Sequence, residues 1–218
     1  VTLGGKVLQE GKDYTISYRN NLNVCVTTVI ATGMGDYTGY TSKNFTITKR
    51  AMTGGTVSVA SSVSFTGSNI TPSVTVKVAG RTLTSDTDYT VSYSNNKKVG
   101  KATVKITGKG KYGGVITKTF TINPAKQEIQ KLTAKSKAFF IDWAQKGSAT
   151  GYEVQYATNS KFTGAKKVTI TNSKTDKTTV SKLSANKKYY VRVRSYTTVG
   201  GTKYYGAWSA VKNVTTKK

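Results

Sequence analysis

DYTISYRNN, residues 13–21, returns almost unchanged as DYTVSYSNN, residues 88–96, at an offset of 75 positions. Aligning residues 1–47 with residues 76–122 requires no gap and gives 22 identities in 47 positions. Repetition at a fixed period identifies a structural unit that the chain uses more than once. The first question is therefore whether these repeated residues form a binding site or part of the fold.

Within the second copy, Tyr89, Val91 and Tyr93 alternate with small polar residues, which gives a strand one apolar face and one wet face. The Asn pair that follows is typical of a hairpin turn with left-handed backbone. Calcium binding by the phrase is the alternative, but one Asp and two Asn supply too few oxygen ligands. Turn residues separate seven expected strands, at 55–59, 62–66, 74–78, 81–84, 89–94, 101–107 and 115–122.

Short strands with regular turns predict an all-β fold of tandem antiparallel β-sandwich modules arranged end to end. We expect a partial repeat at 1–48, a complete repeat at 49–123 and a third domain at 124–218. Val1 aligns with Val76, so counterparts of residues 51–75 would precede the sequence, and we expect the parent protein to continue upstream. A rearranged module spanning residues 1–72 remains the alternative frame.

The stretch GRTLTSDTDYTVSYSNNKKVGKATVKITGKGKYGGVITKTFTI, residues 80–122, resembles the bacterial immunoglobulin-like repeats of Gram-positive gut surface proteins. The resemblance covers residues 1–122. It implies a stalk or spacer role, often beside sugar-active or adhesive domains.

The pattern changes after Pro124, where KAFFIDWAQ (137–145), GYEVQYA (151–157) and KKYYVRVRSY (187–196) follow. These stretches resemble a fibronectin type III domain over residues 125–218. The resemblance places Trp143 in the core and implies a tyrosine corner, because Leu183 precedes Tyr189 by six residues. The residues expected to point inward are Phe139, Ile141, Trp143, Tyr152, Val154, Tyr156, Tyr189, Val191 and Val193.

The opposite face of the same sheet forms the candidate ligand or ladder face. Period two directs Tyr190, Arg192, Arg194 and Tyr196 outward, and Trp208 in GAWS is expected on the neighbouring strand. We predict that Trp208 stacks on Arg192 or Arg194, since a guanidinium is attracted to an indole face. The arrangement is similar to the Trp/Arg ladder of some type III domains.

Exposed aromatic rings can also stack on sugars, which makes a carbohydrate platform the alternative use of this part of the chain. The candidate rings are Phe140, Tyr190, Tyr196, Tyr204 and Trp208.

One Cys and no His exclude a zinc site of the usual kind and the Ser-His-Asp and Cys-His mechanisms. No pair of carboxylates is positioned by the pattern around a cleft. We therefore expect no enzyme activity, no metal and no cofactor. No apolar run approaches 18 residues, so we expect no membrane span.

The net charge is +25, from 34 basic and 9 acidic residues, and 19 of the basic residues lie within 124–218. Such a field attracts polyanions. Only five basic residues are Arg, and no nucleic-acid-binding motif accompanies them, so we expect no specific nucleic acid. Weak attraction to anionic cell-wall polymers or glycans is the expected interaction, and a plain solvated surface is the alternative.

The sequence thus predicts a noncatalytic, monomeric spacer of a secreted multidomain bacterial protein, located at the cell surface or cell wall. One alternative is an adhesive module that binds glycan or host protein through Tyr190, Arg192, Arg194, Tyr196 and Trp208. The other is a set of accessory domains of an extracellular carbohydrate-active enzyme.

Overall fold

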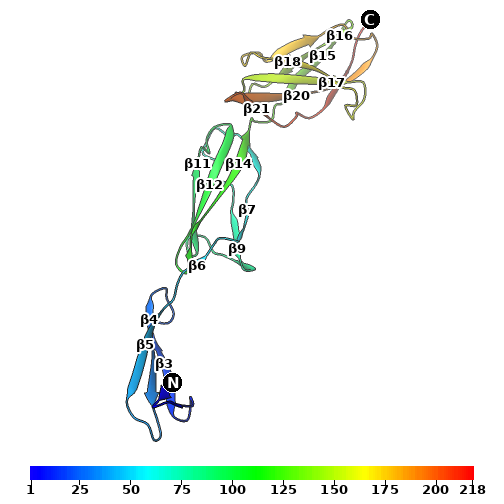
Figure 1. Ribbon diagram of the computed structural model, residues 1–218. Coiled ribbons are helices and arrows are strands. Elements are labelled where there is room, and N and C mark those ends of the chain that lie inside the picture. Colours follow the sequence, from blue (N-terminus) through cyan, green and yellow to red (C-terminus); the bar gives the residue numbers. More distant parts are fainter. The chain divides into compact units, whose positions relative to one another are not determined.

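A computed structural model describes residues 1–218, and it contains strands and no helix (Figure 1). The chain packs as two compact units, which comprise residues 1–57, 75–92 and 105–116, and residues 58–74, 93–104 and 117–218. The expected all-β class of tandem sandwich domains is confirmed. The structure offers no helix with the length and apolar character needed to cross a membrane.

Residues 1–48 form a small hairpin and one three-stranded antiparallel sheet. The hairpin joins β1 (Thr2–Leu3) to β2 (Lys6–Val7). The sheet has the order β3-β4-β5, with bounds Tyr14–Arg19, Val26–Gly33 and Tyr40–Thr46. Tyr14 pairs with Gly33 at one end of this sheet.

The second repeat is built from nine strands in three sheets. Its sheets have the orders β10-β9-β7, β11-β12-β14-β8 and β13-β6. Two pairs in it, β14 with β8 and β13 with β6, are parallel rather than antiparallel. The bounds are β6 Arg50–Ala51, β7 Thr56–Ser58, β8 Ser62–Ser64, β9 Thr75–Val78, β10 Arg81–Thr82, β11 Tyr89–Ser94, β12 Gly100–Gly108, β13 Tyr112–Gly113 and β14 Val115–Asn123. The seven expected strands correspond to β7–β12 and β14.

The repeated phrase forms a strand and the turns at its ends. The carboxylate of Asp88 accepts a hydrogen bond from the backbone N–H of Thr84 at 2.9 Å, and Asp13 accepts one from Gln9 at the same distance. After the strand, Asn20 and Asn95 have φ values of 57° and 55°. Asn tolerates this left-handed conformation better than most residues. The identical Asp and Asn residues are thus used by the turns of each copy.

The two copies differ sharply in how well their sheets are covered. Phe120 is 1% exposed, because Val63, Phe65 and Ile70 pack against the cluster that it forms with Ala102 and Ile122. Those three covering side chains belong to residues 58–74, a segment without a counterpart within residues 1–48. In the first copy, Phe45, the equivalent of Phe120, is therefore 41% exposed.

Alternation along the repeated strand assigns Tyr14, Ile16 and Tyr18 of the first copy to a core, and this prediction is wrong for Tyr18. Its ring is 52% exposed and makes an edge contact with Phe45, at 6.3 Å between ring centroids. Tyr14 and Ile16 are half-buried. Their direction on the sheet is as expected, but most of the layer that would cover them is missing from residues 1–48.

The C-terminal domain is a sandwich of two sheets. One has the order β15-β16-β19, with bounds Ile129–Lys135, Ala138–Trp143 and Lys177–Val180. The other has the order β18-β17-β20-β21, and β22 also pairs with β20. Its bounds are Lys166–Ile170 for β18, Gly151–Ala157 for β17, Lys188–Val199 for β20, Thr202–Tyr205 for β21 and Lys212–Thr215 for β22.

The core of this domain is the one that the sequence predicts. Trp143 is 1% exposed and lies 5.2 Å from Tyr152 between ring centroids. Eight of the nine residues expected inward belong to the buried cluster, and the ninth, Tyr156, packs against it. The Tyr189 hydroxyl accepts a hydrogen bond from the Ser184 N–H at 3.2 Å, so the tyrosine corner is present.

The difference between Phe120 and Phe45 predicts unequal effects of the same substitution. Phe120→Ala removes a fully buried ring, and we expect it to lower the free energy of unfolding of its sheet by about 3–5 kcal/mol. Phe45→Ala removes a ring that is already in contact with water, and we expect about 1 kcal/mol or less. Amide hydrogen exchange measures β12 and β4 separately in the intact chain. Equal loss of protection in the two strands would contradict the difference in burial.

Candidate functional site

The predicted ligand or ladder face lies on the outer side of β20 and its neighbour β17. The register pairs Arg192 with Gln155 and Arg194 with Glu153. Since facing residues of paired strands lie on the same side of a sheet, these four polar side chains form two adjacent rows. The outward orientation of Arg192 and Arg194 follows from alternation with Val191 and Val193, both of which are fully buried.

Five side chains form a continuous stack in which rings and guanidinium groups alternate. The Arg192 guanidinium carbon lies 4.0 Å from the Phe162 ring centroid and 4.6 Å from that of Trp208. The Arg194 carbon lies 4.4 Å from the Trp208 centroid and 4.0 Å from that of Tyr205. The order of the stack, called the ladder below, is therefore Phe162, Arg192, Trp208, Arg194 and Tyr205. Trp208 contacts both guanidinium groups instead of one.

Trp208 is held over β20 by the residue that follows it. It lies between β21 and β22 and not within a regular strand, which differs from the expectation. The backbone N–H of Ser209 donates to the Val193 carbonyl at 2.8 Å. In return, the Ser209 hydroxyl accepts from the Val193 N–H at 3.0 Å. This reciprocal pair fixes the segment beside β20 and positions the indole between the two arginines.

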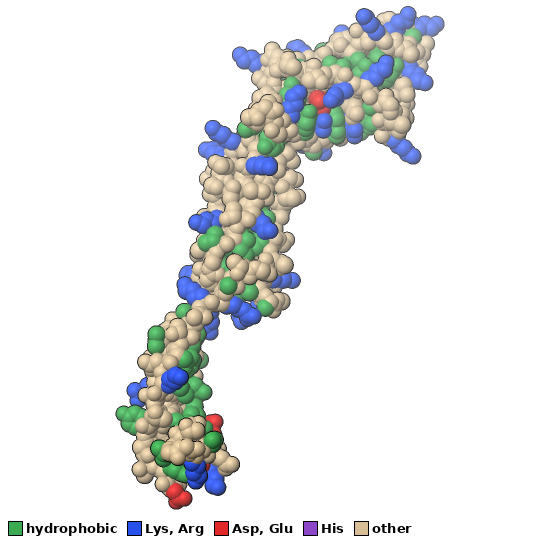
Figure 2. Space-filling view, in the orientation of Figure 1, with side chains coloured by type: hydrophobic (Ala, Val, Ile, Leu, Met, Phe, Trp, Pro, Cys, Tyr) green, Lys and Arg blue, Asp and Glu red, His purple; other side chains and the backbone are tan.

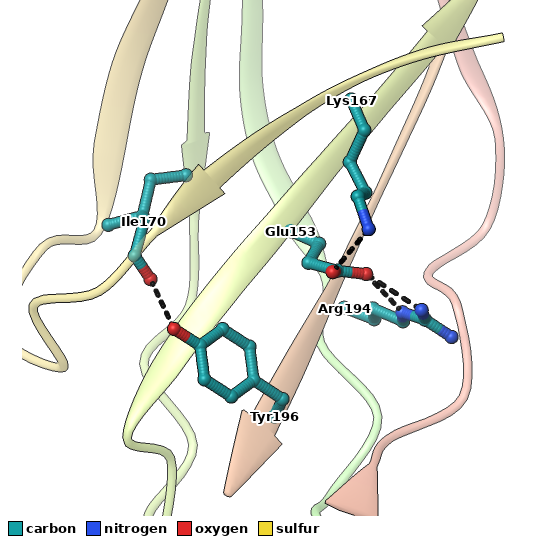
Figure 3. A network of polar contacts seen from close by, with 5 residues as sticks. All are labelled: Glu153, Lys167, Ile170, Arg194 and Tyr196. Carbon is teal, nitrogen blue, oxygen red and sulfur yellow. Dashed lines mark hydrogen bonds and ion pairs between the residues drawn. The ribbon is translucent and has the colours of Figure 1, made fainter. Parts of the chain in front are cut away.

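Glu153 supplies the negative charge beneath the ladder (Figure 3). Arg194 donates to one carboxylate oxygen through Nε at 2.9 Å and Nη2 at 2.7 Å, and Lys167 donates to the other at 2.7 Å. The Glu153 side chain is 2% exposed. Burial by itself raises the pKa of Glu153, but the hydrogen bonds and charges of Lys167 and Arg194 outweigh it and hold that pKa below its ordinary value.

Arg192 has a neutral partner in the register, and Gln155 Oε1 accepts from its Nε at 2.7 Å. Burial and the nearby charge of Arg194 both lower the pKa of Arg192. An arginine remains charged even so. Phe162 and Trp208, which stack on the Arg192 guanidinium, therefore offset much of the free energy that this group loses when water is removed from it.

Tyr196 departs from the expected exposed position, because its ring is only 3% exposed. A Cβ at Gly151 would lie 2.4 Å from the Tyr196 hydroxyl oxygen, so the absent side chain of that glycine makes room for the ring. The hydroxyl donates to the Ile170 carbonyl at 3.4 Å (Figure 3). The Lys203 ammonium covers the ring at 4.6 Å from its centroid. Tyr196 is thus a buried ring at the end of the β17–β20 pairing, where it lies over Gly151.

The other predicted rings are half-buried and do not form one open platform. Lys188 lies 5.3 Å from the Tyr190 ring centroid, and Lys135 lies 5.5 Å from that of Phe140 on the other sheet. Tyr204 and Trp208 are also half-buried. The structure brings Arg192, Arg194 and Trp208 together, and it leaves Tyr190, Phe140 and Tyr204 outside the ladder.

The sequence reasoning missed Glu153, Phe162 and Tyr205 as members of this arrangement. Tyr205 pairs with Tyr196 in the register and could have been placed from alternation along a correctly paired hairpin. Glu153 is the only acidic residue within β17, and its position opposite Arg194 was a usable signal. Phe162 lies in the loop between β17 and β18 with φ of 57°, so no strand pattern could locate it.

No group of three or more His, Cys, Asp or Glu side chains is placed to hold a metal ion. The Asp13 and Asp88 carboxylates each accept a turn N–H, as described above. On the ladder face, Arg192 and Arg194 each have a hydrogen-bond acceptor and stack on aromatic rings. These contacts stabilise one sheet of the C-terminal domain.

The ladder predicts that Trp208 contributes to stability. Trp208→Ala removes a half-buried indole and two cation–π contacts, and we expect the C-terminal domain to lose about 2 kcal/mol. Trp143 and Trp208 are the two tryptophans of the chain, so fluorescence in urea follows unfolding of this domain alone. Tyr190→Ala, which leaves the ladder intact, is the matched control. Equal midpoints for wild type and Trp208→Ala would contradict the ladder.

The lowered pKa of Glu153 predicts that the C-terminal domain loses stability in acid. Because the folded-state pKa lies below the ordinary 4.5, its contribution is present above that pH and is lost as the pH falls through the folded pKa. Glu153→Gln should lower stability at pH 7 by about 1–2 kcal/mol, since two charged donors lose their partner. The gap between wild type and variant should narrow below about pH 4.5. A gap that stays constant in urea titrations between pH 7 and pH 3 would refute this role.

Comparison with known proteins agrees with the fold of the C-terminal domain. Residues 124–211 match the family model of the fibronectin type III domain. No curated protein matches the chain in sequence.

Several solved structures are similar at low identity. The FN1–FN3 domains of chicken CNTN1 are 13% identical, with 96% of this chain and 97% of that chain covered and a TM-score of 0.39. The FN5 domain of Drosophila Lar is 19% identical, with 44% and 98% covered and a TM-score of 0.34. A beta-1,2-glucanase from Parabacteroides distasonis is 16% identical, with 54% and 18% covered and a TM-score of 0.37, so this chain spans under a fifth of that enzyme's length. All three TM-scores are below 0.5. The family match covers less than half of the chain, and residues 124–211 are similar to the fibronectin type III domain.

Proposed function

We propose that the chain is a noncatalytic spacer segment of a secreted, multidomain bacterial surface protein. In this role its sandwich modules hold another part of the protein away from the cell wall. One observation carries the proposal: most of the residues that are identical in the two copies have structural roles. They serve turns, cores and close approaches of the backbone, so what the chain repeats is an architecture.

Individual positions support this reading. Leu8 and Leu83 are both buried, at 8% and 5% exposure. Gly33 and Gly108 both lie where a Cβ would approach backbone atoms within 2.9 Å. A repeated ligand site would instead duplicate polar groups directed at an empty space. The identical Asp13 and Asp88 accept turn N–H groups, and the identical Asn20 and Asn95 supply the left-handed backbone of the turns.

The similarity of residues 124–211 to the fibronectin type III domain also supports the spacer role. Domains of this type are generally noncatalytic, and the charged groups on its most unusual face bond to one another. The surface cations are spread over the molecule and do not form one patch on the face shown in Figure 2. This distribution favours weak, salt-sensitive attraction to anionic cell-wall polymers over a defined anion site.

A spacer must keep its modules folded under load, and stretching single molecules tests this. We expect the intact chain to unfold in discrete steps. The contour length should increase by roughly 250 Å when residues 49–123 unfold and by roughly 320 Å when residues 124–218 unfold. Smooth extension without separate force peaks would overturn the proposal.

The charge predicts how the protein behaves on an anionic matrix. We expect retention on immobilised polyphosphate at low salt and release by about 0.5 M NaCl, because exposed charges are screened within a few ångströms at high ionic strength. A neutral polysaccharide matrix is the control. Retention on that neutral matrix that is lost in Trp208→Ala without loss of folding would replace the spacer with a carbohydrate-binding module.

A further inference from the structure

We propose that a cleft at one end of the C-terminal sandwich binds a phosphate group, either as the free ion or as part of a longer anionic molecule. The cleft has a volume of about 250 Å³ and lies between the end of β17, the start of β18 and the turn that follows β19. This volume is below the roughly 300–1,000 Å³ of most small-molecule pockets, so it suits a single functional group. Its polar lining residues are Tyr156, Thr158, Lys166, Lys182, Ser184 and Tyr189.

Lys166 reaches the cleft from the inner side of its sheet. The register of β17 and β18 pairs Lys166 with Tyr156, and paired residues lie on the same side of a sheet. Tyr156 packs against the core, so Lys166 also starts from the core-facing side. The next residue, Lys167, points to the outer face, where it bonds to Glu153. Lys166 takes part in neither of the two ion pairs of the chain, so its charge has no carboxylate partner.

Lys182 contributes a second cation from the turn between β19 and β20. Its backbone is left-handed, with φ of 61°, which is uncommon for a residue with a side chain. The next residue fixes this turn, because Leu183 is buried and its N–H donates to the Lys137 carbonyl at 2.9 Å. Lys182 also takes part in neither ion pair. Two ammonium groups without a carboxylate partner therefore line one cleft.

Two tyrosine hydroxyls add hydrogen-bond donors to these charges. The rings of Tyr156 and Tyr189 lie 6.1 Å apart between centroids. The Tyr189 hydroxyl accepts from the Ser184 N–H, so its own proton is free for an acceptor in the cleft. The Tyr156 hydroxyl makes no hydrogen bond within the protein. Burial, together with nearby Tyr189, raises the pKa of Tyr156, so this phenol stays protonated near neutral pH and acts as a donor.

No acidic side chain lines the cleft to compete for these donors. Residues 124–218 contain four acidic residues, which are Glu128, Asp142, Glu153 and Asp176. Glu153 lies on the outer face and is bonded to Arg194 and Lys167, and none of the other three contributes to the lining. A cleft that offers cations and hydroxyl donors without a carboxylate favours an anionic ligand.

A phosphate group fits these donors better than a carboxylate does. The donors belong to four segments: the end of β17, the start of β18, the turn at 181–187 and the start of β20. A carboxylate has two oxygens in one plane, whereas a phosphate presents three or four around a tetrahedral centre and accepts from several directions. Lysine binds phosphate as a point charge, so the site does not require the fork of an arginine.

The loop between β17 and β18, which forms one wall of the cleft, is fixed before any ligand binds. The Asn159 side-chain amide donates to the Thr163 carbonyl at 2.9 Å and accepts from the Thr163 N–H at 3.1 Å. Phe162 of the same loop stacks on Arg192 in the ladder. The loop is thus held on both sides of Phe162, and a ligand that binds beside Gly164 pays little for ordering it.

The inference goes beyond the spacer role and beyond the diffuse attraction of the surface cations, and it depends on neither. Lysines spread over a surface do not define an anion site by themselves. The cleft differs because hydroxyl donors line it together with two of those lysines. Lys166, Lys182 and Ser184 are exposed, so the cleft is open to a phosphate within a longer chain as well as to the free ion.

Titration of the intact chain with inorganic phosphate, followed by NMR, tests the cleft. The ionic strength is kept at about 0.15 M with NaCl, so that screening of the other surface charges stays constant. We expect saturable shifts of the amide signals of Gly164 and Ser184. A second titration uses a glycerol phosphate oligomer. Saturation by both ligands shows that the free ion is sufficient, and saturation by the oligomer alone assigns the site to a phosphodiester of a polymer; both results support the proposal.

Variants of the intact chain separate the cleft from the net charge. Lys166→Gln with Lys182→Gln should weaken binding by about tenfold, because two charged donors are lost. Tyr156→Phe keeps the ring and should weaken binding by about threefold. The matched control is Lys146→Gln with Lys174→Gln, which removes the same charge from exposed positions outside the cleft and should leave the affinity nearly unchanged.

Equal weakening by the two double variants would show that net charge alone attracts phosphate, and it would overturn the proposal. The absence of saturation with either ligand would overturn it as well. Saturation by sodium acetate at the same concentrations would assign the cleft to carboxylates instead of phosphate. Each of these results leaves the spacer role and the diffuse attraction to anionic polymers in place.

Discussion

A β-sheet with one apolar face needs a second layer over that face, and this requirement organises every part of the chain. In the C-terminal domain the layer is another sheet, and Trp143 lies between the two with 1% exposure. In the second repeat the layer comes from residues 58–74, which bury Phe120. In residues 1–48 the strands and turns are the same, but the layer is incomplete and Phe45 is exposed. The strand pattern of a segment therefore does not by itself determine how far the apolar face of its sheet is buried.

The outer face of the C-terminal domain poses the opposite physical problem, because charges there are removed from water. Two arginines on one strand would repel each other, and burial penalises both. Glu153 neutralises one of them, Gln155 accepts from the other, and three rings cover their flat faces. Because every donor that is withdrawn from water near Glu153 has a partner, the face adds stability to the sheet. The same closure leaves the Trp208 ring stacked against two guanidinium groups.

Most of the fold could be predicted from the sequence, since alternation and turn residues are local signals. The expected β11, at 89–94, has the observed bounds, and the core around Trp143 is the predicted one. The exposure of Tyr18 could not be read from the same pattern, because a strand's alternation states which way a side chain points and not whether anything covers it. For the ladder, Arg192 and Arg194 were predictable from period two, whereas Trp208 was expected on a strand and lies between β21 and β22. Phe162 was not, because a residue in a loop reaches the stack through tertiary structure alone.

The differences between the two copies carry as much information as the identities. Ala31 stands where the second repeat has Ile106, and it lines a groove of residues 1–48. Ile106 is fully buried, so alanine at the equivalent position leaves several carbon atoms fewer inside the first copy. Close packing would require this volume to be filled, and in the first copy it is part of this groove. The two copies therefore share their strands and turns but not the packing of their interiors.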